Sequence, residues 1–152
     1  MKRVLNLILV GGLVAAFGCS KETTTVAAAT GPTSEQVRVN VTMPTTIMAS
    51  DVFVLAGSFT KDAWTPDKST TTLVKQADGT FSVDVSTRDF DKKLEFKVVR
   101  NPKNGTDAWL HVEKDGKCDE LAGNRTLDAA TQAGKEVKIK VDNFRGTGTC
   151  PK

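Results

Sequence analysis

The feature that most constrains the fold is a succession of short segments in which apolar and polar residues alternate. In residues 36–43 every second side chain is apolar, so these side chains share one face, as in a half-buried β-strand. Residues 52–58 form a more continuous apolar run, which is typical of a strand covered on both faces. The pair Asp78-Gly79 is a hairpin signal between two such segments. The chain is therefore expected to fold mainly from β-strands.

Seven segments of this kind are expected to be strands, and they lie at residues 36–43, 52–58, 73–74, 81–85, 94–99, 108–112 and 136–141. In the fifth of them, the alternation directs Leu94, Phe96 and Val98 inward and Lys97 outward. No helix is expected, because the run at residues 127–134 is too short. Seven short strands with turns between them indicate an all-β fold, an antiparallel immunoglobulin-like β-sandwich.

The first 18 residues have the pattern of a secretory signal peptide. A basic start is followed by an apolar run that is shorter than the roughly 20 residues a spanning helix needs. The segment Ala16-Phe17-Gly18-Cys19 resembles the bacterial lipobox, which implies cleavage before Cys19 and lipidation of that residue. Ser20 is compatible with delivery to the outer membrane. We therefore expect a lipid-anchored protein at the bacterial outer membrane or cell surface; the alternative is an ordinary signal peptide in which Cys19 is incidental.

The segment after Cys19 has too little apolar bulk to pack. Residues 20–34 are small and rich in Thr and Ala, so residues 19–35 are expected to form a lipidated Cys with a flexible tether, and residues 36–152 the folded domain. Loss of Lys2 and Arg3 with the signal peptide leaves 19 basic residues against 18 acidic ones. This near-neutral balance gives no electrostatic reason to expect a nucleic acid as partner.

Cysteine usage agrees with an exported protein. Cys118 and Cys150 are expected to pair in an oxidising compartment, which would attach the C-terminal tail to the loop after the sixth expected strand. Closing a loop of that size adds about 3–4 kcal/mol in the chain-entropy account. A zinc site is disfavoured, because the chain has no Cys-x-x-Cys motif and a single His.

The sequence does not have the motifs of a common catalytic site. His111 is the only imidazole, there is no Gly-x-Ser-x-Gly elbow, and there is no Gly-rich phosphate loop. The 18 acidic residues leave a glycosidase carboxylate pair open, but the pattern singles out no two of them. His111 is expected to be a surface residue. We therefore expect no enzyme activity, no cofactor and no metal site.

The two tryptophans suggest binding. Alternation in residues 108–112 directs Trp109 and His111 outward, and Trp64 lies in a polar loop without periodicity, so both Trp are expected to be exposed. One exposed Trp is readily explained as cover for a sandwich edge. Two of them, in a chain without Tyr, favour an apolar binding platform. Sugar rings present apolar C–H faces to such a platform and hydroxyls to neighbouring polar groups.

Five segments, in the order found here, are similar to those of starch-binding domains, the carbohydrate-binding modules of glucoamylases and some amylases, which are related to glycogen-binding modules. They are Val52-Phe53-Val54-Leu55-Ala56-Gly57-Ser58-Phe59 with Trp64-Thr65-Pro66-Asp67, then Ala77-Asp78-Gly79-Thr80-Phe81-Ser82-Val83-Asp84-Val85, then Leu94-Glu95-Phe96-Lys97-Val98-Val99-Arg100, then Trp109, and Ala122-Gly123-Asn124-Arg125-Thr126. The resemblance spans residues 37–142. Its fold is the sandwich already expected.

The resemblance implies a carbohydrate-binding site in which Trp64 and Trp109 stack on glucose rings while Lys97 and Asn124 reach sugar hydroxyls. A longer segment, which includes Cys118, separates Trp109 from Asn124 than in the family. The absence of Tyr leaves no claim for a second site. The expected function is non-catalytic binding of starch, glycogen or a malto-oligosaccharide near separate amylolytic enzymes. The alternative is a structural or protein-interaction sandwich that has lost sugar binding.

Overall fold

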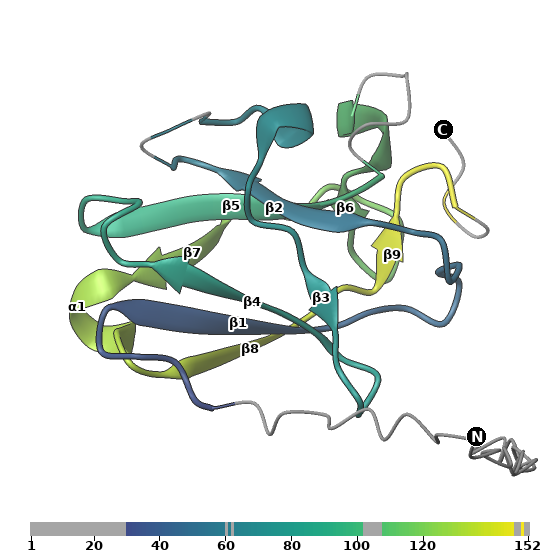
Figure 1. Ribbon diagram of the computed structural model, residues 1–152. Helices are drawn as coiled ribbons and strands as arrows, with labels where there is room; N and C mark the ends of the chain where they lie inside the picture. The colour runs from purple at the N-terminus through teal and green to yellow at the C-terminus, as the bar shows by residue number, and fades with distance from the viewer. Residues whose placement is uncertain (1–29, 60, 62, 102–107, 148–149, 151–152) are drawn as a thin grey trace, which may run out of the picture.

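A computed structural model describes residues 30–59, 61, 63–101, 108–147 and 150. The expected signal peptide, Cys19 and the tether as far as residue 29 lie outside the described residues. Across the described part the protein is an all-β sandwich, as the alternation predicts (Figure 1). No helix in these ranges is long and apolar enough to cross a membrane.

The first sheet has the strand order β3-β4-β1-β8. Its strands are β1 (Gln36–Thr42), β3 (Val74–Lys75), β4 (Phe81–Ser86) and β8 (Glu136–Lys140). Strand β1 pairs antiparallel with β4 and parallel with β8. The other strand pairs of the described residues are antiparallel, so the expected antiparallel sandwich is confirmed; β1 and β8 are parallel because the chain reaches β8 only after crossing from the other sheet.

The second sheet has the order β2-β5-β7 and carries the candidate site. Its strands are β2 (Phe53–Gly57), β5 (Lys93–Arg100) and β7 (Arg125–Asp128). A small third sheet pairs β6 (Glu113–Lys114) with β9 (Asn143–Phe144). In Figure 1, β2 and β5 lie above β1 and β8, so the two larger sheets face one another across the core.

The core fills the space between the two larger sheets. Val37, Val39 and Val41 of β1 are fully buried, as are Leu94, Phe96 and Val98 of β5, in one cluster. These are the side chains that the period-two pattern directs inward, so the expected inner faces of both strands are confirmed. All five residues of β2 are buried, as predicted for a strand covered on both faces.

Several local elements differ from the sequence expectation, among them the short strands β6 and β9. The segment expected as a strand at residues 108–112 is mostly a 3₁₀ helix, η2 (Ala108–His111). Strand β7 follows a long loop and was not expected, and it leads into one turn of α-helix, α1 (Ala129–Gln132). The Asp128 side chain caps this turn by accepting a hydrogen bond from the Ala130 N–H, and the turn is four residues long within the run at residues 127–134 that was expected to be too short for a helix.

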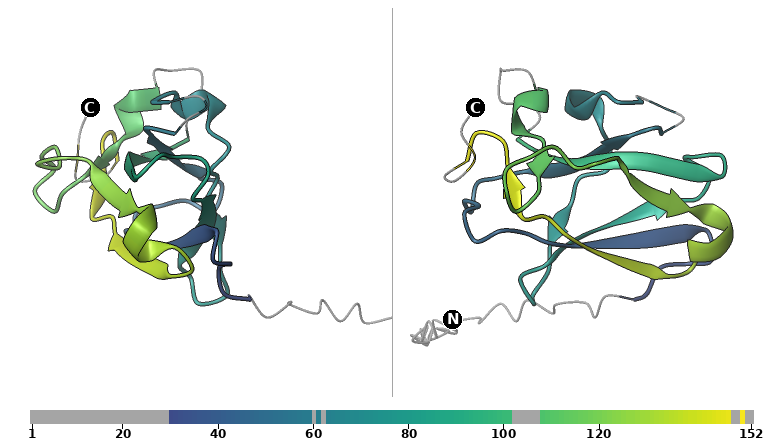
Figure 2. Two further views of the ribbon diagram at one scale, coloured as in Figure 1. Left: turned by 90° about the vertical axis from the view of Figure 1, so that its left-hand side faces the viewer. Right: turned by 180° about the vertical axis from the view of Figure 1, so that it is seen from behind.

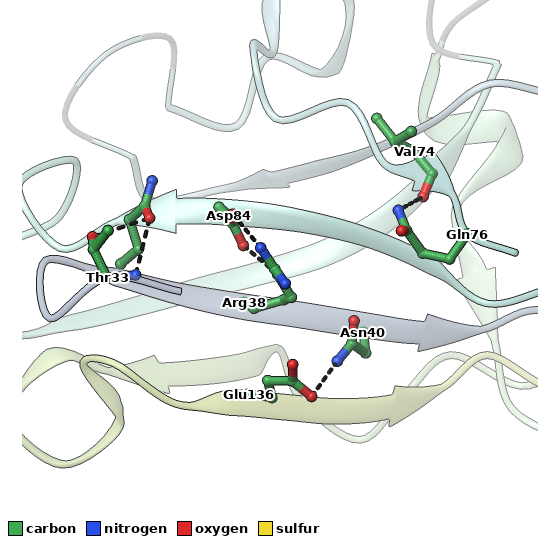
Figure 3. A network of polar contacts seen from close by, with 8 residues as sticks. Thr33, Arg38, Asn40, Val74, Gln76, Asp84 and Glu136 are labelled. Carbon is green, nitrogen blue, oxygen red and sulfur yellow. Dashed lines mark hydrogen bonds and ion pairs between the residues drawn. The ribbon is translucent and has the colours of Figure 1, made fainter. Parts of the chain in front are cut away.

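On the first sheet, polar side chains of neighbouring strands hydrogen-bond to one another (Figure 3). Arg38 donates two hydrogen bonds, of 2.7 and 2.8 Å, to the carboxylate of Asp84 on the neighbouring strand. Asn40 donates to Glu136 at 3.1 Å. These cross-strand pairs fix the register of β1 between β4 and β8.

Candidate functional site

The indole rings of Trp64 and Trp109 contact each other on the outer side of the second sheet. Their centroids are 6.2 Å apart and their planes are inclined by 37°. Trp64 precedes the 3₁₀ helix η1 (Pro66–Lys68), and Trp109 belongs to η2. The two short helices stand side by side above β2 and β5 (Figure 2). Two residues far apart in the sequence thus form one aromatic surface, which we call the Trp pair.

Both members of the Trp pair are half-buried, so the expectation that they are exposed is wrong. Part of each ring is covered by the other ring. Trp109 also packs against a small apolar cluster that includes Val54, Ala56 and Val99 on the outer face of the second sheet. The cluster exists because β2 is apolar on both faces, which gives η2 a surface on which to pack.

The loop that carries Trp64 holds this residue in an unusual backbone conformation. Its φ is 54°, in the left-handed region that bulky side chains rarely adopt. The Trp64 N–H donates to the Gly57 carbonyl at 2.8 Å, and the buried Pro66 begins η1 two residues later. Such a conformation costs about 1–3 kcal/mol and persists only where surrounding contacts impose it.

Gly57 is required by a close approach of two strands beside this loop. A Cβ atom at position 57 would lie 2.1 Å from the Glu95 carbonyl oxygen and 2.7 Å from the Phe96 Cβ. Directly after it, the Ser58 N–H donates to that Glu95 oxygen at 2.8 Å, and the Ser58 hydroxyl accepts from the Glu95 N–H at 2.9 Å. The Gly-Ser pair therefore joins the end of β2 to β5, at the root of the Trp64 loop.

Lys97 lies on the outer face of β5, as predicted, and it is half-buried. It is directly opposite Ala56 in the β2–β5 register, and Ala56 belongs to the cluster beneath Trp109. The Lys97 ammonium donates to the Gly123 carbonyl at 3.4 Å. Lys97 thus connects the region of the Trp pair to the turn that precedes β7.

Asn124 lies in that turn and is exposed. Its side-chain amide donates to a Glu95 carboxylate oxygen at 3.0 Å. Glu95 and Lys97 share the outer face of β5, because alternate residues of a strand point the same way. The four predicted site residues are therefore all associated with the outer side of the second sheet. Sequence reasoning missed Glu95, although its alternation with Phe96 placed it on the same face as Lys97.

The long segment between Trp109 and Asn124 is attached to the C-terminal part of the chain. Cys118 and Cys150 form the expected disulfide, which closes a sequence separation of 32 residues. Within the segment, the Asp115 side chain accepts hydrogen bonds from the N–H groups of Lys117 and Asp119, both at 2.8 Å. The extra residues therefore form an ordered loop ahead of Asn124.

Glu120 anchors the same loop through charge. It accepts from Lys114 at 2.6 Å and also pairs with Arg145 from the C-terminal segment. The hydrogen bond from Lys114 is the main cause that lowers the pKa of Glu120 below its ordinary value, and the positive charges of Lys114, Arg145 and Lys97 add to it against the opposing effect of burial. Glu120 therefore stays ionised near neutral pH and joins the loop electrostatically to β6, β5 and the C-terminal turn.

An ion pair whose carboxylate is fully buried lies beside the turn that holds Asn124. Glu113 of β6 is fully buried and accepts from the Val98 N–H at 2.8 Å and from the Arg125 Nε at 2.9 Å. Arg125 also donates to the Lys140 carbonyl at 2.6 Å. This pair joins β5, β6, β7 and β8. Sequence reasoning missed it, because a charged residue in a two-residue strand carries no signal of burial.

The arrangement offers aromatic faces, an ammonium donor and an amide. Among the described residues, no group of three His, Cys, Asp or Glu side chains is placed to hold a metal ion. His111, expected as a surface strand residue, is half-buried in η2. The site is suited to contacts with the apolar face of a ligand and hydrogen bonds to its hydroxyls.

A β-sandwich with an aromatic pair on the outer face of one sheet is the class of structure that these observations define. No family model matches the sequence. Over 110 residues the chain is 31% identical to an amylopullulanase from Thermoanaerobacterium thermosulfurigenes; the match takes in 72% of this chain and 5% of that protein. A glycoside hydrolase family 15 glucoamylase from Hypocrea jecorina is similar in structure with a TM-score of 0.44 and 14% identity, over 76% of this chain and 18% of that one.

Proposed function

We propose that this protein is a non-catalytic module that binds starch or a related α-glucan. The observation that carries the proposal is the contact between Trp64 and Trp109 beside Lys97 on one outer sheet face. Aromatic rings gain from covering apolar C–H surface, and the neighbouring ammonium donates to hydroxyls. The alternative of a structural or protein-interaction sandwich predicts Trp rings that are buried or far apart; here the two rings are half-buried and in contact.

Two further observations support an α-glucan as the ligand. The relative with 31% identity is an amylopullulanase, an enzyme whose name refers to α-glucans, and the shared segment is only 5% of its length. A segment of that size suits an accessory module better than the whole activity of the enzyme. The ring planes also differ by 37°, so the Trp pair suits a curved polymer better than a flat chain, which would need coplanar platforms.

The full chain, purified in mild detergent, is tested in two ways. Its retention on insoluble starch is measured, and its migration is followed in gels that contain glycogen. We expect retention that soluble cyclodextrin competes away, with a dissociation constant of about 10 μM to 1 mM, as is reasonable for one shallow site. Cellulose serves as the control polymer and should retain nothing. Absence of affinity for starch, glycogen and cyclodextrin would refute the proposal, and release of reducing sugar from soluble starch would refute its non-catalytic part.

We further propose that a lipid on Cys19 anchors the module at the outer membrane, where it would hold the polymer near separate amylolytic enzymes. The lipobox-like segment Ala16-Phe17-Gly18-Cys19 supports this. Several acyl chains would give stable anchoring at about 0.8 kcal/mol per buried methylene. Cys19→Ser should move the protein from the membrane fraction to the soluble fraction and abolish incorporation of labelled palmitate. Unchanged fractionation and labelling would refute the anchor without affecting glucan binding.

A further inference from the structure

We propose that Glu95 is a positioning residue of this site: it holds Asn124 so that the carbonyl oxygen of the Asn124 side chain, and not its amide nitrogen, is presented to the ligand. The inference rests on the proposed glucan binding and deepens it. The interaction that carries it is the hydrogen bond of 3.0 Å from the Asn124 Nδ2 to the Glu95 Oε2.

The chemistry of the two groups fixes which end of the amide meets Glu95. An ionised carboxylate has only acceptor sites, so it bonds to the NH₂ end of an amide and repels the oxygen end. The Asn124 Oδ1 is therefore turned away from Glu95. Asn124 is exposed, which leaves this oxygen accessible to an incoming hydroxyl.

Glu95 is itself held firmly enough to act on Asn124. Both backbone polar groups of Glu95 are bonded to Ser58: its carbonyl accepts at 2.8 Å and its N–H donates at 2.9 Å. The two strands approach so closely at Gly57 that an added Cβ atom there would collide with the Glu95 carbonyl oxygen. The Glu95 side chain thus projects from the part of β5 that is tied directly to the root of the Trp64 loop.

Lys97 supplies the complementary group. It lies two residues along the same face of β5, about 7 Å from Glu95 along the strand. An ammonium only donates, whereas the oriented Asn124 Oδ1 only accepts. Since every sugar hydroxyl can both donate and accept, one ligand can bond to the ammonium through one hydroxyl and to the amide oxygen through another. In this arrangement the face of a sugar ring would lie on the Trp pair, while Lys97 and Asn124 would bond to the hydroxyls along its edge.

The test compares glucan affinity and melting temperature for matched variants of the full chain. Glu95→Ala should weaken binding about three- to tenfold with little change in melting temperature, because both side chains are exposed. Glu95→Gln should bind nearly as the wild type does, since the new amide oxygen still accepts from Asn124. Glu136→Ala is the matched control: it removes the acceptor of the equivalent Asn40–Glu136 bond on the other sheet (Figure 3) and should leave affinity unchanged.

A second pair of variants reverses the donor and the acceptor of the bond between residues 95 and 124. It tests whether Glu95 orients the side chain at position 124 or only supports the structure. Asn124→Asp should weaken binding, because its carboxylate is repelled by Glu95. Adding Glu95→Gln to that variant should restore most of the affinity, since the new amide donates to one carboxylate oxygen and leaves the other as the acceptor for the ligand. Two results would overturn this inference alone. In the first, the wild type binds starch and Glu95→Ala binds it equally well. In the second, the variant with both Glu95→Gln and Asn124→Asp does not regain affinity. Failure of the wild type to bind any glucan would overturn the proposed function, and this inference with it.

Discussion

Trp109→Ala is expected to abolish detectable retention on starch. An aromatic side chain of this size buries about 150–250 Å². If roughly 100 Å² of its face covers a sugar, the loss at about 25 cal/mol per Å² is ~2.5 kcal/mol. That corresponds to a decrease in affinity of about 70-fold. The substitution also removes the ring against which Trp64 rests. Affinity electrophoresis in starch gels measures the effect directly.

Trp109→Phe is the matched control for this variant. It keeps an aromatic face above Val54, Ala56 and Val99, so it should retain weak binding and a melting temperature close to that of the wild type. Trp64→Ala should reduce affinity to a similar degree as Trp109→Ala. Retention of the folded Trp109→Ala variant on starch at the wild-type level would show that the glucan binds elsewhere on the protein.

Glu113→Ala is expected to destabilise the fold by about 3 kcal/mol, because breaking a buried ion pair from one side leaves the partner charge uncompensated. Glu113 is fully buried and serves both the Val98 N–H and the guanidinium of Arg125. The substitution therefore leaves the Val98 N–H on β5 without its acceptor and the Arg125 guanidinium without its counter-ion. Urea unfolding followed by circular dichroism gives the change in free energy of unfolding.

Glu113→Gln tests which part of that loss comes from charge. The amide oxygen can still accept one of the two hydrogen bonds, so the loss should be about half that of Glu113→Ala. Glu35→Ala provides a surface comparison, since Glu35 pairs with Arg88 where both side chains are largely exposed, and it should change stability by less than about 1 kcal/mol. Equal stability of the wild type and Glu113→Ala would mean that the pair contributes nothing to the fold.

The sequence predicted the elements whose pattern is imposed by the core. Strands β1 and β5 were predicted with the correct inner faces, because a strand that turns one face to the core and polar residues outward shows alternation along its length. The segment Ala108-Trp109-Leu110-His111-Val112 alternates in the same way, yet it is largely a 3₁₀ helix. Its conformation depends on packing over the β2–β5 cluster, which no local pattern reveals. Strand β7 was missed because only Leu127 among its residues is apolar.

The sequence predicted which residues belong to the candidate site, but it did not predict how these residues are arranged in space. The alternation placed Lys97 outward and the resemblance named Trp64, Trp109 and Asn124, but the contact between the two rings is a long-range one that depends on how η1 and η2 dock. The half-burial of both rings follows from that same docking. The role of Glu95 was missed for a related reason: its partner approaches from a turn 29 residues further along the chain.

The placement of the two faces has a consequence for how the protein would meet a polymer. The described chain begins just ahead of β1, in the first sheet, whereas η1 and η2 stand on the opposite side of the sandwich (Figure 1). The proposed lipid anchor would therefore be attached on the side of the sandwich that is remote from the two tryptophans. With the point of attachment on the far side from the rings, the proposed anchor would not block them, so a granule too large to fit between the protein and the bilayer would still have access to both rings.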